Sequence, residues 1–221
     1  MFTTMAQFFQ AGGPMMGVIL GVLAGAAAVG AERLHFFMRT AREDADRLVT
    51  DVARHVADGD LQAPLQGLDG NDGPAARLLR RGVAELWEGA AADEVRRAVE
   101  EAALVELPRY GRRLNYLPML ANVATLAGLL GTIFGLQQSF GALAAADAAT
   151  KASVLAAGIG QAMNTTAFGL MVAMPCLVLH ARLGSLAQRR SDACDAALVR
   201  FLNFCDAHEK TRRAAPCRVV G

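Results

Sequence analysis

The chain has 221 residues, of which 53% are hydrophobic and 19% are charged, and its mean hydropathy is +0.28. Soluble domains carry about 25% charged residues, so a soluble globule, a disordered chain and a disulfide-stapled secreted domain all fit poorly. Acidic residues, lysine and arginine are missing from three long runs, residues 1–31, 114–146 and 152–181. This distribution predicts a membrane protein.

Each of the three runs is long enough to form a helix that crosses a bilayer. A hydrocarbon core about 30 Å thick needs roughly 20 apolar residues of α-helix. The runs are continuous rather than alternating, which excludes membrane strands. The first run lacks the positively charged start of a cleaved signal peptide, so we interpret it as a retained helix. The predicted spans are residues 14–36, 116–141 and 153–182.

The positively charged residues predict the orientation of these spans. Of the 22 Lys and Arg residues, 21 lie within residues 33–113 and 182–218, and the other is Lys151. Positive residues accumulate on the cytoplasmic side of membrane proteins. We therefore expect residues 1–13 and 142–152 to be periplasmic, and residues 37–115 and 183–221 to be cytoplasmic.

The first cytoplasmic segment begins with a helix predicted over residues 37–57, because its apolar residues recur at helical spacing. Turn-forming residues dominate the stretch from residue 58 to residue 74. Pro74 suits the first turn of a second helix, which we expect to run to about Gly89. Residues expected on the buried face of the first helix are Leu48, Val52 and Val56, and the expected caps of the second are Asp72 or Gly73.

Two longer helices complete the cytoplasmic prediction. One begins near Asp93 and continues toward Leu114, with kinks at Pro108 and Gly111, because proline removes a helical hydrogen bond. The third membrane helix has no breaker after Arg182 and is expected to continue to about residue 213. The predicted fold class is thus all-α, with three transmembrane helices and long cytoplasmic helical extensions.

The sequence offers no pattern typical of an enzyme. Cys205 and His208 have a spacing that could hold part of a metal site, but four ligands at tetrahedral spacing are missing, so packing is the expected role. No Ser-His-Asp set and no phosphate-binding loop are recognisable. We expect no catalysis, no metal and no cofactor.

Small and polar residues follow each predicted span at helical spacing. Such stripes let helix backbones approach closely in lipid. In the first span the stripe consists of Gly13, Gly17, Gly21 and Gly25. In the second it consists of Thr125, Gly128, Thr132, Gly135 and Ser139. In the third it consists of Gly158, Ala162, Thr166, Gly169 and Ala173, with Gln161, Asn164 and Thr165 beside it.

Two roles stay open for the polar residues of the second and third spans. Their hydroxyl and amide groups could join helices together, or they could line a water-filled pathway. His180 is the one acidic or basic side chain in these two runs. A proton or cation relay normally needs a carboxylate, so the missing charge would have to come from a partner.

Residues 126–140, LAGLLGTIFGLQQSF, resemble the second-helix signature of the ExbB/TolQ/MotA proton-channel family. Residues 158–176, GIGQAMNTTAFGLMVAMPC, resemble its third-helix signature, and Glu32-Arg33 resembles its first helix more weakly. The similarity spans nearly the whole chain. It lies nearer to the ExbB and TolQ members than to flagellar MotA, which has an additional helix.

The resemblance implies a homopentamer in the bacterial inner membrane, with the second and third helices around a central pore. Single helices of an ExbD/TolR-like partner, each with an essential Asp, would occupy that pore. Proton flux would then drive an envelope process, such as TonB-dependent uptake, Tol-type envelope maintenance or gliding. By position, Thr132 and Thr166 match the threonines that face the partner's Asp.

The resemblance also assigns roles to neighbouring residues. Close packing is implied for Gly128, Gly131, Gly135 and Gly169, and a bend for Pro175. Gln161 stands where ExbB and TolQ typically carry Glu, and an amide does not titrate near neutral pH. Asn164 and Thr165 add polarity that would hold water. The alternatives are a structural membrane scaffold and a small transporter subunit without motor activity.

Overall fold

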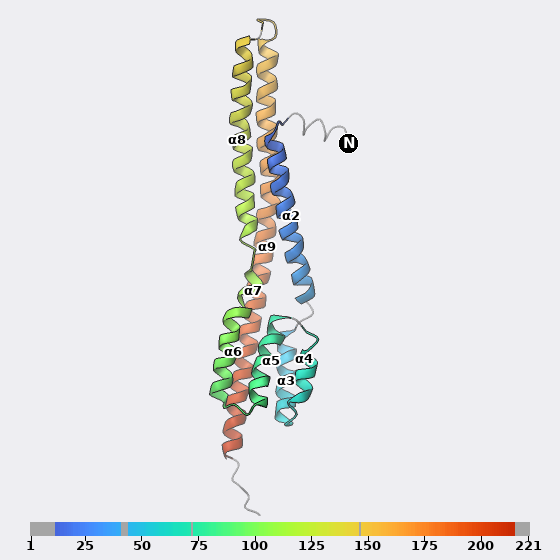
Figure 1. Cartoon of the computed structure of the whole chain (residues 1–221), viewed down its shortest axis with the longest axis vertical. Coiled ribbons are helices and arrows are strands. Elements are labelled where there is room, and N and C mark those ends of the chain that lie inside the picture. The colour runs from blue at the N-terminus through green and yellow to red at the C-terminus, as the bar shows by residue number, and fades with distance from the viewer. Residues whose placement is uncertain (1–11, 41–43, 72, 146, 215–221) are drawn as a thin grey trace, which may run out of the picture. The chain divides into compact units, whose positions relative to one another are not determined.

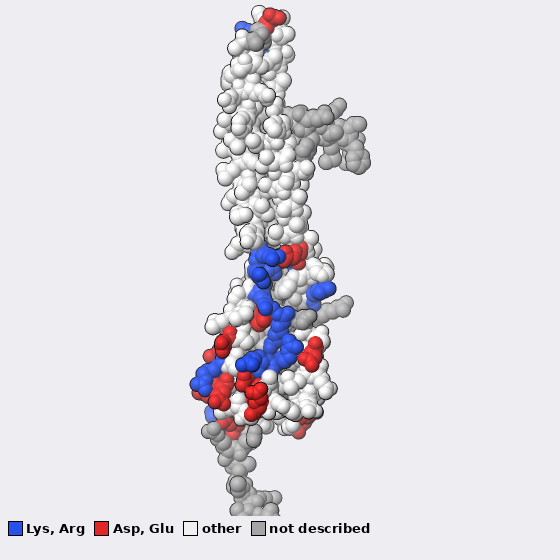
Figure 2. Space-filling model, viewed as in Figure 1, with Lys and Arg blue, Asp and Glu red and all other residues white. Residues whose placement is uncertain are grey.

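The computed structural model describes residues 12–40, 44–71, 73–145 and 147–214, and all regular structure in these ranges is helical. The chain divides into two compact units, each described by itself. The apolar unit comprises Met1–Leu34 and Arg113–Leu183, and the polar unit comprises His35–Arg112 and Gly184–Gly221. Figure 2 shows their difference in charge: patches of Lys, Arg, Asp and Glu are spread over the visible face of the polar unit, whereas most of the apolar unit's face is white.

Three helices supply the apolar unit: α2 (Met15–Thr40), α8 (Tyr116–Ala145) and α9 (Lys151–Ala214). Within the described residues, these three are long and apolar enough to cross a membrane. In the apolar unit α8 and α9 lie side by side, and α2 lies along them (Figure 1). The turn between α8 and α9 closes where the Thr150 N–H donates to the Asp147 carbonyl at 2.9 Å.

In its described residues, the polar unit contains the end of α2, five shorter helices and the C-terminal part of α9. The five shorter helices are α3 (Ala45–Ala57), α4 (Gln62–Leu68), α5 (Pro74–Trp87), α6 (Ala92–Glu106) and α7 (Pro108–Gly111). Phe201 of α9 is fully buried, and its ring fills the space beside Gly82 of α5 and Val99 of α6. Burial of apolar side chains such as this one is the main force that holds such a bundle together.

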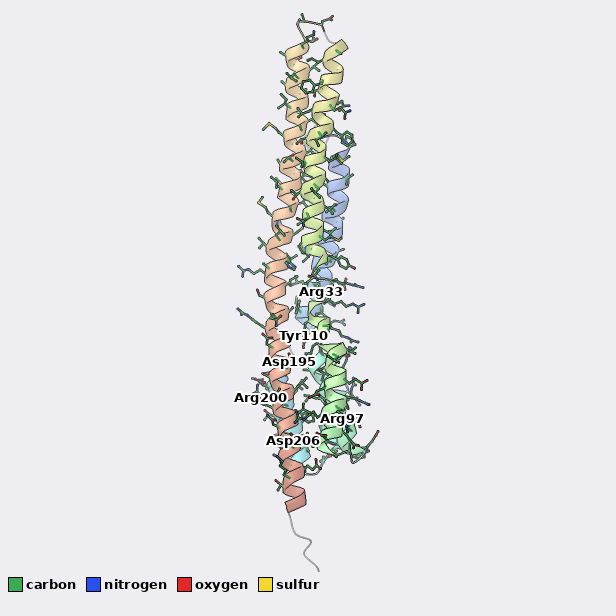
Figure 3. The ribbon with its side chains drawn as sticks, turned by 90° about the vertical axis from the view of Figure 1, so that its left-hand side faces the viewer. Arg33, Arg97, Tyr110, Asp195, Arg200 and Asp206 are labelled. Atoms are coloured by element: carbon green, nitrogen blue, oxygen red, sulfur yellow. The ribbon has the colours of Figure 1, made fainter. Side chains whose placement is uncertain are left out.

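Polar contacts connect α9 to the other helices of the polar unit. Arg200 donates to the Asp46 carboxylate at 2.6 Å, and Arg96 of α6 donates to Asp206 at 2.5 Å. Figure 3 shows Arg200 and Asp206 on α9. Both pairs are partly exposed, so each contributes about 1 kcal/mol or less to stability.

The helix predicted over residues 37–57 is interrupted in the structure. α2 ends at Thr40 and α3 begins at Ala45, where the Asp44 side chain accepts from the Arg47 N–H at 3.4 Å. Aspartate is a favoured N-cap because its carboxylate satisfies a backbone donor that has no helical partner. The buried face of α3 also differs from the prediction, since it contains Val49 in place of Leu48, together with Val52 and Val56.

The turn-rich stretch that follows contains a short helix that the prediction missed. α4 forms because the Asp60 carboxylate accepts from the backbone N–H groups of Gln62 and Ala63, at 3.0 and 3.2 Å. Pro64 lies in the first turn of α4, where its missing N–H costs nothing. The helix predicted from Pro74 is α5, and Gly73 is its N-cap. The alternative cap, Asp72, lies outside the described residues.

The predicted kink at Pro108 and Gly111 is a complete break. α6 ends at Glu106, and α7 is a single turn from Pro108 to Gly111. Arg113 then adopts a left-handed backbone conformation, with φ at 62°, before α8 begins. A non-glycine residue in this region disrupts helical geometry, so α6 and α8 are separate helices.

Candidate functional site in the apolar unit

Two glycines bring the backbones of α8 and α9 into direct contact. A Cβ atom on Gly169 would lie 2.7 Å from the Ala124 carbonyl oxygen, and one on Gly128 would lie 3.3 Å from the Thr166 Cα. Such distances leave no room for a side chain, which is typical of small-residue interfaces in membranes. The other predicted glycines that face a residue of the opposite helix at short range are Gly131, Gly135 and Gly158.

Two adjacent threonines of α9 hydrogen-bond to residues outside α9. Thr166 Oγ1 donates to the Gly128 carbonyl of α8 at 3.0 Å. Thr165 is fully buried, and its Oγ1 lies 2.9 Å from the Gly12 carbonyl and 2.9 Å from the Gln161 carbonyl. A hydroxyl has one proton, so Thr165 divides its donation between these two acceptors. Thr165 therefore connects α9 to the residues just before α2.

The two predicted threonines of α8 bond within their own helix. Thr125 Oγ1 donates to the Ala121 carbonyl at 3.0 Å, and Thr132 Oγ1 donates to the Leu129 carbonyl at 2.6 Å. Both hydroxyls keep their acceptor lone pairs available. Thr132 is half-buried, whereas Thr125 is exposed in the single chain. Each hydroxyl can thus remain satisfied in an apolar setting and still accept a proton donor.

The Gln161 amide lies against the turn that precedes α2. A Cβ atom on Gly13 would collide with Gln161 Nε2, and Gly13 has φ at +71°, a conformation that glycine adopts most easily. Asn164 is half-buried on the next turn of α9. Gln161 and Thr165 therefore meet the Gly12-Gly13 turn together, an arrangement that the sequence pattern did not predict.

Part of the predicted glycine stripe at α2 contacts the rest of the apolar unit, and so does Gly30, which lies outside the stripe. A Cβ atom on Gly17 or Gly21 would meet nothing within 4 Å, and one on Gly25 would lie 3.9 Å from Leu120 Cδ1. A Cβ atom on Gly30 would lie 2.8 Å from Leu179 Cδ2 of α9. Packing at Gly17 and Gly21 stays a prediction for a surface outside the single chain. Pro175 lies inside α9, which is one uninterrupted helix.

Charged residues gather at one end of the apolar unit. Arg113 Nη1 lies 2.6 and 2.7 Å from the two carboxylate oxygens of Glu32, although 81 residues separate the pair in sequence. Arg33 is buried, at 4% exposure. Leu114 follows Arg113 in the sequence, and its carbonyl oxygen lies 3.1 Å from Nδ1 of His180, a residue of α9. The sequence singled out His180 as the one acid or base in its run but did not predict its contact with Leu114.

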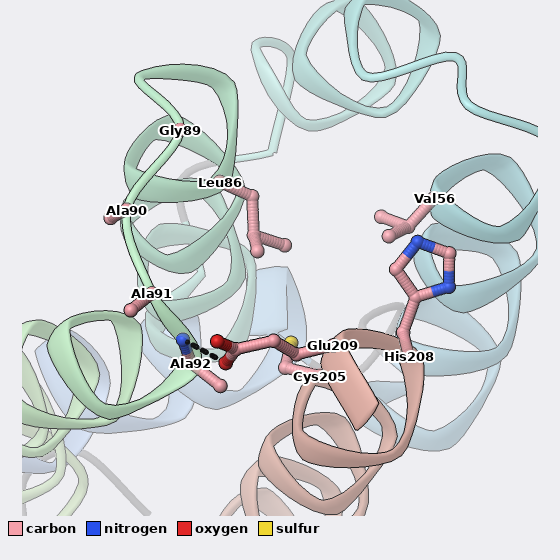
Figure 4. A pocket seen from close by; sticks show the side chains of 9 residues that line it. All are labelled: Val56, Leu86, Gly89, Ala90, Ala91, Ala92, Cys205, His208 and Glu209. Carbon is pink, nitrogen blue, oxygen red and sulfur yellow. Dashed lines mark hydrogen bonds between the residues drawn. The ribbon is translucent and has the colours of Figure 1, made fainter. Parts of the chain in front are cut away.

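The polar unit contains an open cavity of about 380 Å³ between α3, the α5–α6 turn and α9 (Figure 4). Cys205, His208 and Glu209 line it, and Glu209 accepts from the Ala92 N–H at 2.8 Å. Burial, with a smaller contribution from Asp206, raises the pKa of the Cys205 thiol to about 12. In the described part of the chain, no three His, Cys, Asp or Glu side chains are grouped to hold a metal ion.

The sequence that forms the α8–α9 contacts matches a known family. The MotA/TolQ/ExbB proton channel family model matches residues 71–196, which is more than half of the chain. The chain belongs to this family. The match includes α5, α6 and α8 and extends along α9 to residue 196, so it covers Thr132, Gln161 and Thr166 but leaves α2 outside.

Individual members of the MotA/TolQ/ExbB family align with different shares of the chain. A Synechocystis protein named ExbB-like 3 is 31% identical over 200 residues, which cover 87% of this chain and 94% of that protein. The biopolymer transport protein exbB1 of Vibrio cholerae is 38% identical over 58% of this chain and 55% of its own length. The Tol-Pal system protein TolQ of Pseudomonas aeruginosa is 36% identical over 53% and 54%.

Proposed function

We propose that this chain is a non-enzymatic subunit of a proton-driven motor or channel in the inner membrane. The observation that carries the proposal is the contact between α8 and α9, where Thr166 donates to Gly128 across a glycine interface. The family is described as one of proton channels, and relatives named ExbB and TolQ align with the chain. The polar stripe lies in runs that have no carboxylate of their own.

A partner with an intramembrane carboxylate completes the proposed pathway. We infer an ExbD/TolR-like subunit, whose single helix brings an Asp beside Thr132 and Thr166. A hydroxyl can donate to a carboxylate and accept from a carboxylic acid, so both protonation states of the Asp would be satisfied. Several copies of α8 and α9 around such helices correspond to the homopentamer expected from the family resemblance.

The proposed orientation places the charged end of the apolar unit at the cytoplasmic face. It rests on the location of 21 of the 22 Lys and Arg residues on that side of the spans. Proton flux would then run from the side of the α8–α9 turn toward Arg113 and Arg182. The driven envelope process is set by the partners of the assembly, as in TonB-dependent uptake, Tol-type envelope maintenance and gliding.

In this proposal Gln161 has a structural role. Its amide lies against Gly13, and the neighbouring Thr165 hydroxyl reaches Gly12. These contacts support the start of α2, so the absence of a titratable side chain at position 161 is compatible with proton transport. Titration along the pathway then depends on the partner's Asp.

The test measures proton flux through the chain purified with its Asp-bearing, single-helix partner and reconstituted in liposomes. A potassium diffusion potential drives proton entry, and a pH-sensitive dye in the lumen reports the initial rate. Thr166→Val should lower this rate roughly 100-fold, as expected when one preorganised polar group is removed from a charge-bearing site. The matched control is Thr211→Val, because Thr211 also lies in α9, is exposed, and bonds only to the Ala207 carbonyl of its own helix.

The outcomes separate this function from the alternatives. Proton entry that needs the partner and falls in Thr166→Val but not in Thr211→Val supports the proposal. An assembly that forms normally yet moves no protons would favour the structural scaffold. Unchanged flux in Thr166→Val would remove Thr166 from the pathway.

A further inference from the structure

His180 is the one acidic or basic side chain in the two charge-free runs that contain α8 and the apolar part of α9. Its ring is half-buried, and Nδ1 lies 3.1 Å from the Leu114 carbonyl oxygen. A carbonyl oxygen can only accept, so Nδ1 carries a proton in this contact. In the neutral ring, Nε2 therefore holds a lone pair and can accept a second proton.

His180 continues the contact that Thr166 makes with α8. Fourteen residues separate Thr166 from His180, and fourteen separate their acceptors, Gly128 and Leu114. Fourteen residues are close to four turns of an α-helix, so both side chains project from nearly the same face of α9 and lie about 21 Å apart along it. The same arrangement thus occurs twice: a side chain of α9 donates to a backbone carbonyl of α8, or of Leu114 just before it.

Glu32, Arg33, Arg113 and Arg182 lie at this same end of the apolar unit, whereas Asp147 and Lys151 lie at the α8–α9 turn. α2 packs against α9 where Gly30 meets Leu179, and the next turn of α2 contains Glu32 and Arg33. Arg113, the residue before Leu114, donates to both carboxylate oxygens of Glu32 and forms an ion pair with it. On α9 itself, the neighbouring titratable or charged groups are Cys176, one turn before His180, and Arg182, which is exposed. His180 is thus placed between the polar stripe and the charged end.

We propose that His180 accepts the proton at the charged end of the pathway that Thr166 lines, an inference that rests on the function proposed above. The Nε2 lone pair forms a bond to a proton donated by a hydronium ion in the pathway, which becomes neutral water, and the ring becomes an imidazolium. The Nδ1–H stays on the Leu114 carbonyl throughout. Nε2 then releases its proton to water at the cytoplasmic face, so the cycle needs no rotation of the ring.

The test compares His180→Asn with the wild-type chain, each reconstituted with the partner as described above. Asparagine can still donate to the Leu114 carbonyl, but it cannot take up a proton near neutral pH. The initial rate of proton entry should fall about tenfold, which is less than a full acid–base contribution because water can replace the ring in part. Imidazole added to the buffer should restore the rate. His35→Asn is the matched control, because His35 is exposed near the same end of α2.

The outcomes separate a proton-accepting role of His180 from a role in packing. An unchanged rate of proton entry in His180→Asn would overturn the inference and leave the proposed function intact. A slower rate that imidazole does not restore would assign His180 to holding α9 against α8, and would also overturn it. Absence of proton entry in the wild type would overturn the proposed function itself.

Discussion

Substituting Gly169 by alanine should separate α8 from α9 and destabilise the apolar unit. The new methyl group would lie 2.7 Å from the Ala124 carbonyl and 3.1 Å from the Gly128 Cα, both of them backbone atoms that no rotamer change can move. Relief of this overlap needs a displacement of about 0.7 Å between the helices. The same displacement stretches the hydrogen bond from Thr166 to the Gly128 carbonyl beyond its present 3.0 Å and out of effective range.

The expected magnitude combines three effects. Overpacking at a tight contact costs about 1–3 kcal/mol. Loss of the Thr166 hydrogen bond costs about 1 kcal/mol in a membrane helix pair. Alanine offsets about 1 kcal/mol of this, because it has a higher helix propensity than glycine. The free energy of unfolding should therefore fall by about 1–3 kcal/mol.

The assay is unfolding of the purified chain in mixed micelles, followed by circular dichroism as the SDS fraction rises. Gly160→Ala is the control, since Gly160 also lies in α9 but a Cβ atom there would meet nothing within 4 Å. That variant should be as stable as the wild type or up to about 1 kcal/mol more stable. If Gly169→Ala unfolds at the same SDS fraction as the wild type, the close contact of α8 with α9 is not what limits the stability of this unit.

Two further predictions concern the polar unit. Phe201→Ala should lower its free energy of unfolding by about 3–5 kcal/mol, measured by thermal unfolding, because the ring is fully buried against Gly82; a loss below about 1 kcal/mol would contradict this packing. In the folded unit Cys205 keeps its proton up to about pH 12, whereas an unfolded thiol loses it near its ordinary value of 9.0. The unfolded state is therefore favoured as pH rises from 9 toward 12, and the wild type should lose more stability over this window than Cys205→Ala.

Much of the candidate site could be predicted from the sequence because each membrane-spanning helix needs a long run without charged residues. A bilayer excludes charge over about 20 residues, so the gaps in the distribution of Asp, Glu, Lys and Arg predict α8 and the apolar parts of α2 and α9. Small residues at helical spacing predict a close interface. The structure contains that interface at Gly128 and Gly169.

Other features depend on segments that are distant in the sequence. The stripe on α2 predicts packing, but which glycine is covered depends on where α2 crosses α9, and Gly30 is the residue that meets Leu179. The helix boundaries near α3 and α4 also differ from the prediction. The carboxylates of Asp44 and Asp60 accept from backbone N–H groups at the start of each helix, and apolar periodicity does not register such local contacts.

The sequence by itself determined that this is an all-helical membrane protein with a charge-free polar stripe, because hydration of charged groups governs where they can lie along the chain. Only the tertiary structure decided the partners of that stripe. Thr165 meets Gly12 across 153 residues, Thr166 meets Gly128 across 38, and His180 meets Leu114 across 66. These contacts follow from the antiparallel register of α8 and α9 and from the crossing of α2, which arise from packing of whole helices rather than from any local pattern.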